Sequence, residues 1–356
     1  MMENFRPTKA VIDLGAIRRN TARLVEKYKG YQYYMAVVKA DCYGYRGFDV
    51  VRAMLDGGAN CLAASLLEEG LALREHFPNT PILLFTPVPL AQLEVMRDNN
   101  LWATVATQRQ AEIAATVEGL QVVIRANGGS DILGGPTTPA EFHVLWSTLT
   151  NGRCSLKGIY LHSYNAECIE DTAAEYATFE NMTAGLPLES LELVSISNSL
   201  TLPRYGKKDY ANACRLGNIV YRIESEDAEL ENTFTLTSRV LNVFTLKEGQ
   251  SVAYSRAYTA TKDSTHIAAV PIGFGDGFSK TNIGRDVFIN GNRYPIVAVT
   301  MDITHILVDN AVSEDDEVVL IKDTHHLDEI AAHIHGATEE AICALNKRVT
   351  REYIDR

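Results

Sequence analysis

The chain of 356 residues is acidic, with a formal net charge of −12, and 46% of its residues are hydrophobic. An acidic surface speaks against binding to nucleic acid or to an anionic membrane, but it leaves room for a locally basic site for a small anion. The six cysteines form no CxxC pair, and neither a signal peptide nor a bilayer-spanning apolar run is found, so we expect free thiols in a cytoplasmic protein.

Strand-like and helix-like segments alternate over the first two thirds of the chain. The expected strands are 9–13, 33–39, 61–64, 81–85, 103–106, 120–125, 156–162 and 193–197. Helix patterns lie between them, at 14–27, 49–56, 66–76, 90–99, 108–116, 139–148 and 172–183. Such alternation is typical of a parallel sheet covered by helices, and about eight strands in series predict a closed barrel.

The pattern changes near residue 233. Short β runs follow at 233–245, 258–260, 265–271, 287–289, 294–299, 303–308 and 317–321, and then a helical stretch at about 327–345. This spacing predicts an antiparallel β domain. We therefore expect an α/β fold in which residues 1–230 form an eight-stranded (β/α) barrel and residues 231–356 a mainly-β domain.

Lys39 is the most informative single residue. It follows a β-branched apolar run and precedes a turn that holds Tyr43 and Gly44. A lysine at the end of a buried strand is costly unless its amine is used. Aldehyde cofactors such as pyridoxal 5′-phosphate (PLP) bind covalently to such amines.

Other reactive side chains fall where barrel strands end, which is where barrel enzymes carry their sites. His162 ends one expected strand and Ser-Asn-Ser at 197–199 follows another. Arg-Leu-Gly-Asn at 215–218 reads as a later loop, whose glycine backbone could hold a phosphate.

Several segments together resemble the alanine racemase family. Val-Lys-Ala-Asp-Cys-Tyr-Gly at 38–44 is similar to its PLP-lysine motif, and 197–199 and 215–217 resemble its phosphate and pyridine contacts. The segments 252–259, 270–277, 300–302 and 347–353 resemble motifs of its C-terminal domain, in the same order. The resemblance runs from Val11 to Tyr353.

The resemblance implies a PLP-binding barrel, a β domain and a homodimer in which the partner's C-terminal domain completes each site for a small amino-acid substrate. Lys39 would bind PLP covalently, Arg215 would face the pyridine nitrogen, and Met301 would offer its backbone N–H to the substrate carboxylate. The remaining cofactor contacts would be His162 and, around the phosphate, Tyr43, Ser199, Gly217, Asn218 and Tyr353.

Inversion of an amino acid needs one base on each face of the substrate. Lys39 would serve one face and Tyr254, from the partner subunit, the other. A free tyrosine has a pKa of about 10, so a tyrosine base needs cationic neighbours, for which His162 and Arg215 are the candidates. An arginine cannot give its proton to the pyridine nitrogen, which would make the cofactor a weaker electron sink and limit side reactions.

The chain departs from the family pattern near the substrate. A lysine and, seven residues later, an arginine are expected where this chain has Arg125 and Ile132. We expect Arg125 to supply the cation for the cofactor's phenolic oxygen and the substrate carboxylate. The other departures are Ser195 for histidine, Phe274 for tyrosine, Asn218 for isoleucine, and Ser255 and Arg222 for glycines.

Alternatives remain for single residues and for the activity. His162 could be a core histidine, Arg125 could pair with a barrel carboxylate, and Asp302 is expected to be structural rather than a base. A PLP-dependent racemase with alanine as default substrate is the leading hypothesis. A racemase of another amino acid, such as serine or one with a larger side chain, and a non-catalytic PLP-binding homologue are the others.

Overall fold

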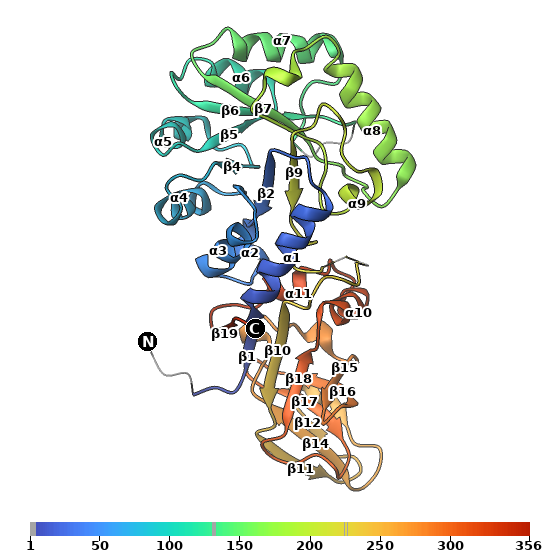
Figure 1. The fold of residues 1–356 in the computed structure, drawn as a ribbon. Helices are drawn as coiled ribbons and strands as arrows, with labels where there is room; N and C mark the ends of the chain where they lie inside the picture. Colours follow the sequence, from blue (N-terminus) through green and yellow to red (C-terminus); the bar gives the residue numbers. More distant parts are fainter. Residues whose placement is uncertain (1–4, 130–132, 224, 226) are drawn as a thin grey trace. The chain divides into compact units, whose positions relative to one another are not determined.

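The structure is a computed structural model that describes residues 5–129, 133–223, 225 and 227–356. The chain divides into two compact units (Figure 1). The first, the β unit, comprises Met1–Ile17, Tyr43–Arg46 and Tyr221–Arg356. The second, the barrel unit, comprises Arg18–Cys42 and Gly47–Val220.

The barrel unit contains, among its described residues, an eight-stranded parallel sheet in the order β8-β7-β6-β5-β4-β3-β2-β9. The strands are β2 (Tyr33–Val37), β3 (Cys61–Ala64), β4 (Ile82–Leu84), β5 (Trp102–Val105), β6 (Gln121–Ala126), β7 (Ser155–Leu161), β8 (Leu193–Ser195) and β9 (Ala213–Leu216). A parallel bridge joins Ser197, which follows β8, to Cys214 of β9, and this bridge nearly closes the barrel. The expected barrel is thus confirmed.

Helices cover the outside of this sheet (Figure 1). They are α3 (Phe48–Asp56), α4 (Leu67–His76), α5 (Leu93–Asp98), α6 (Gln108–Ala114), α7 (Pro139–Thr150), α8 (Ile169–Met182) and α9 (Thr201–Tyr205), with 3-10 turns η1 (Leu90–Gln92) and η2 (Leu188–Ser190). Local sequence explains the start of α7: the Thr138 hydroxyl accepts the Glu141 N–H, and Pro139 is the first residue of the helix. Helix α1 (Leu14–Lys27) begins in the β unit and continues in the barrel unit.

The β unit is built on a nine-stranded sheet, among its described residues, in the order β11-β14-β17-β16-β15-β18-β10-β1-β19. Its strands are β1 (Lys9–Asp13), β10 (Phe234–Arg239), β11 (Asn242–Leu246), β14 (Thr265–Val270), β15 (Asp286–Ile289), β16 (Asn292–Val299), β17 (Thr304–Val308), β18 (Glu317–Ile321) and β19 (Thr350–Ile354). A hairpin of β12 (Ser251–Val252) and β13 (Tyr258–Thr259), helices α10 (Thr324–Ile334) and α11 (Glu340–Cys343), and turns η3 (Tyr254–Arg256), η4 (Phe274–Asp276) and η5 (Lys280–Asn282) complete the unit.

The first strand of the chain lies in a different sheet from the one expected. β1 pairs with β10 and β19 in the β unit, so the barrel begins with β2 and ends with β9, which contains Arg215 and Leu216 rather than leaving them in a loop. The physical reason is burial. Alternate residues of β1 are buried, as in a sheet with one covered face, whereas all four residues of β3 are buried, as a barrel strand requires.

No helix in the described part of the chain is long and apolar enough to cross a membrane.

Candidate active site

Lys39 begins a turn of unusual hand at the end of β2. Ala40, Asp41, Cys42 and Tyr43 all have positive φ, between 52° and 56°. This left-handed conformation costs an L-residue roughly 1–2 kcal/mol. Backbone strain of this kind persists only where surrounding contacts hold it, and it is concentrated at functional sites. The Cys42 N–H donates to the Val38 carbonyl at 3.0 Å and closes the turn.

Two buried arginines lie close to one tyrosine inside the barrel. Arg125 on β6 is in register with Tyr160 on β7, and the Arg215 Cζ lies 5.7 Å from the centre of the Tyr160 ring. Burial raises the pKa of Tyr160, whereas its hydrogen bond with Thr104 and the charges of Arg125 and Arg215 lower it; burial is the larger effect, so the hydroxyl stays protonated. The barrel interior is therefore positively charged at this level.

One nitrogen of the Arg215 guanidinium makes no hydrogen bond to the described residues. Its Nη1 donates to the Ser195 carbonyl and to Ser195 Oγ, both at 3.3 Å. Its Nη2 is buried and has no partner among the described residues. Burial lowers the pKa of Arg215 to about 10, so the guanidinium remains charged at neutral pH. A buried, charged donor without a partner fits a site that receives an acceptor from a ligand.

His162 follows β7 and does not carry the charge expected of it. Protein atoms crowd the ring and desolvate it, and the charges of Arg215, Arg125 and Lys39 act in the same direction, so its pKa lies well below its usual range. His162 is also partly exposed to solvent, which weakens the effect of burial. The charges of the three neighbouring cations still lower its pKa. The lowered pKa speaks against His162 as a cationic neighbour for a tyrosine base.

The segments after β8 and β9 meet at the predicted phosphate contacts. The Gly217 N–H donates to Ser199 Oγ at 3.0 Å. Asn198 Oδ1 accepts the N–H groups of Leu200 and Thr201, which fixes the loop that presents Ser199. Asn218 follows as a half-buried residue. The predicted contacts Ser199, Gly217 and Asn218 are thus neighbours in space.

Tyr43 and Tyr353 belong to the β unit. The Tyr353 hydroxyl, on β19, donates to the carbonyl of Arg46 at 2.9 Å, and the Tyr43 ring lies 5.5 Å from that of Tyr221. Gly44 can only be glycine, because its φ is +80° and a Cβ would lie 2.7 Å from the Ile342 carbonyl oxygen. The structure brings Tyr353 to the segment that contains Tyr43.

Tyr254 and Met301 are surface residues of the β unit, 69% and 51% exposed. The Met301 carbonyl accepts the Gly275 N–H at 2.8 Å, whereas the Met301 N–H makes no hydrogen bond within the described part of the chain. Next to it, Asp302 pairs with Arg348 at 2.6 Å, and Arg348 also reaches the buried Asp276 at 3.1 Å. These ion pairs agree with the structural role expected for Asp302.

The structure thus gathers one part of the predicted site in the barrel unit and another in the β unit. The barrel unit holds Lys39, Arg125, His162, Ser199, Arg215, Gly217 and Asn218, and the β unit holds Tyr43, Tyr254, Met301 and Tyr353. Ile132, whose position motivated the role given to Arg125, lies outside the described residues.

Two residues in these surroundings were not predicted from the sequence. Tyr160 lies two positions before His162, and its inward position follows once the register of β7 is known. Glu69 accepts the Ala40 N–H at 2.7 Å, next to Lys39. The sequence did contain a signal for Glu69: it lies three residues after Leu66, a spacing typical of a carboxylate that caps the start of a helix.

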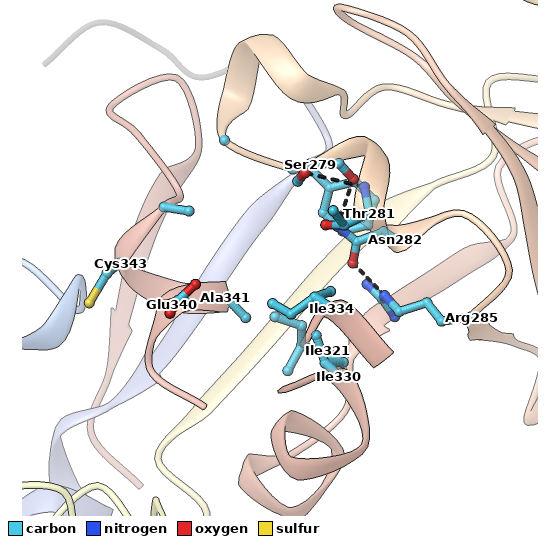
Figure 2. A pocket seen from close by; sticks show the side chains of 13 residues that line it. Ser279, Thr281, Asn282, Arg285, Ile321, Ile330, Ile334, Glu340, Ala341 and Cys343 are labelled. Atoms are coloured by element: carbon cyan, nitrogen blue, oxygen red, sulfur yellow. Dashed lines mark hydrogen bonds between the residues drawn. The ribbon is translucent and has the colours of Figure 1, made fainter. Parts of the chain in front are cut away.

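A separate cavity of about 500 Å³ lies within the β unit (Figure 2). Ile321, Ile330 and Ile334 line one part of it and the η5 turn another (Figure 2). Arg285 is held at its edge by Asn282 Oδ1 at 2.5 Å. None of the predicted site residues lines this cavity, so it is distinct from the candidate active site.

Comparison with known proteins agrees with the fold and with the motifs. Residues 12–225 match the family model of the alanine racemase N-terminal domain, and residues 233–353 match that of its C-terminal domain. Alanine racemase 1 of Bacillus subtilis is 31% identical over 99% of this chain and 94% of its own length.

Solved structures give the same result. The alanine racemase of E. faecalis superimposes with a TM-score of 0.90 at 27% identity, covering 99% of this chain and 100% of that chain. The alanine racemase of Bacillus anthracis with bound L-Ala-P gives 0.90 at 26% identity, with 99% and 96% covered. The chain therefore belongs to the alanine racemase family of PLP-dependent amino-acid racemases.

Proposed function

We propose that this chain racemises alanine with PLP as cofactor, and that Lys39 and Tyr254 are its two bases. The observation that carries the proposal is the arrangement around Lys39. A lysine at the end of a barrel strand lies among the charges of Arg125 and Arg215, and a neutral His162 lies beside them. These charges attract an anionic ligand, and the Lys39 amine is near enough to act on the same histidine.

The residues present fit PLP. The buried Arg215 Nη2 has no partner in the described part of the chain and would donate to the pyridine nitrogen. Ser199, Gly217 and the Asn218 backbone would hold the phosphate, to which Tyr43 and Tyr353 would add hydroxyl groups. Arg125 would face the phenolic oxygen. When bound, the cofactor withdraws electrons from the substrate's Cα and acidifies its proton.

The side chains then divide the proton transfers between them. Lys39 Nζ would remove or return the Cα proton on one face, and Tyr254 Oη would do so on the other. Arg215 remains protonated, since its pKa is about 10, so it would donate a hydrogen bond to the ring nitrogen without transferring the proton. The Met301 N–H would bind the substrate carboxylate together with Arg125.

We further propose a homodimer in the cytoplasm, with Tyr254 and Met301 completing the partner's site. Both residues are exposed on the β unit and neither is enclosed by it. None of the six cysteines is in a disulfide bond, in agreement with a reducing compartment.

A different amino acid is the second candidate substrate. Arg125 is buried beside Tyr160, and it stands where the family pattern has a lysine. The resemblance predicts an arginine seven residues later, where this chain has Ile132, so a cation supplied by Arg125 instead would change the space that remains for a substrate side chain. Serine and larger amino acids are therefore included in the test.

The test is to incubate the PLP-loaded protein with a panel of L-amino acids in deuterated water. We expect deuterium at Cα and formation of the D-enantiomer, with alanine as the best substrate. Exchange without any D-product would contradict a racemase. No exchange with any amino acid would favour the non-catalytic alternative.

A further inference from the structure

The turn that carries Lys39 needs support from outside itself. Residues 40–43 are four consecutive non-glycine residues in the left-handed region. The left-handed conformation costs roughly 1–2 kcal/mol per residue. The summed cost for the four residues is a large fraction of the free energy of unfolding of a typical domain. Without contacts that hold it, the backbone of the turn would relax, and the orientation of the Lys39 side chain would change.

Glu69 provides such a contact from helix α4. Its Oε1 accepts the Ala40 N–H at 2.7 Å, and its Oε2 accepts the N–H groups of Ser65 and Leu66 at 2.9 and 3.0 Å. One carboxylate thus joins the residue after Lys39 to the start of α4. Hydrogen bonds to an ionised acceptor are roughly twice as strong as neutral ones.

The helix that presents Glu69 is itself held closely against the barrel. Gly70, the next residue, is buried, and a Cβ there would lie 2.8 Å from the Leu84 side chain of β4. The carboxylate is therefore presented from a rigid element. By contrast, the bonds from Gly47 to Asp41 and from Cys42 to Val38 join residues within the turn region.

We infer that Glu69 is a positioning residue for Lys39, which rests on the function proposed above. The amine has to alternate between holding the cofactor and moving a proton at one face of the substrate. Both tasks need the same backbone direction at Lys39. A misplacement of about 1 Å in an active site costs on the order of 100-fold in rate.

The experiment compares E69A and E69Q with a matched control, E68A. Glu68 is exposed in the same first turn of α4, so its loss removes helix-end charge without touching the Lys39 turn. In the cofactor-free protein, we expect amide hydrogen exchange of residues 40–42 to rise about tenfold in E69A and to stay unchanged in E68A. E69Q keeps one acceptor oxygen and should lie between them.

In the PLP-loaded protein we expect kcat to fall about tenfold to 100-fold in E69A, with KM changed less than about twofold. Equal exchange rates, or equal losses of kcat, in E69A and E68A would overturn the inference. If E69A does not fold, E69Q against E68Q carries the same comparison. Failure of the proposed function is recognised separately, because the wild-type protein would then not racemise, whereas the exchange measurement needs neither cofactor nor substrate.

Discussion

Arg125 is the residue that we expect to replace the family's lysine–arginine pair. It is buried on β6 and lies beside Tyr160. Its charge also contributes to the low pKa of His162, so it lies near the centre of the candidate site. These neighbours favour a role in the site over a purely structural pairing with a barrel carboxylate.

Replacing Arg125 by methionine tests that role. Methionine keeps the length and apolar volume, so the main loss is the charge. Because a hydrogen bond to a charged group contributes about 1.5–3 kcal/mol, kcat/KM should fall about tenfold to 100-fold. The control is R125K, which keeps a point charge but loses the planar fork and should lie between wild type and R125M. Steady-state kinetics with unchanged kcat/KM in R125M would support the structural alternative.

The sequence was sufficient to predict where Lys39 and His162 lie along the chain, but it could not predict the electrostatic surroundings of His162. Lys39 and His162 were expected at strand ends, and both lie there. Burial lowers the pKa of His162, and the charges of Arg215, Arg125 and Lys39, which three other strands bring to it, act in the same direction. Only the folded barrel determines which charged groups surround His162.

The turn around Tyr254 shows how an element accommodates a departure from the family pattern. Ala253, Ser255 and Arg256 have φ of 66°, 54° and 56°. The resemblance predicts glycine at the position of Ser255 and at that of Arg222, and Arg222 also has positive φ, 59°. Glycine adopts this region without steric cost, which would account for glycine at both positions.

Replacing Ser255 by glycine should therefore stabilise the protein. Relief of left-handed strain exceeds the extra freedom that glycine gives the unfolded chain, so we expect a gain of about 0.5–1 kcal/mol in the free energy of unfolding. Ser313 offers a matched control, because it is also exposed in the β unit but is not among the residues with positive φ. Denaturant unfolding should show S313G to be neutral or destabilising. A loss of stability in S255G similar to that in S313G would contradict the explanation.

Elements were predictable where local patterns decide them. The barrel strands with continuous apolar runs and the capped helix α7 follow from the sequence. The left-handed turn at residues 40–43 does not, because it contains no glycine to signal it and depends on Glu69, 29 positions from Ala40. The place of β1 was missed for a similar reason, since its partners β10 and β19 are more than 200 residues away.

At the scale of the whole molecule, the predicted site residues are divided between the two units. Lys39 lies in the barrel unit, and Tyr254 and Met301 are exposed on the β unit. The proposal that Tyr254 serves the site of a partner subunit follows from this exposure together with the family resemblance. It makes the dimer a requirement for activity.

Mixing two inactive variants tests this account most directly. K39A and Y254F each lose one base, so each homodimer should be nearly inactive. In a K39A/Y254F heterodimer, purified with a different tag on each chain, one site would have both bases and the other neither. We predict recovery of about half of the wild-type activity, as closed two-fold symmetry requires. A heterodimer as inactive as either parent would contradict a two-base site shared between subunits.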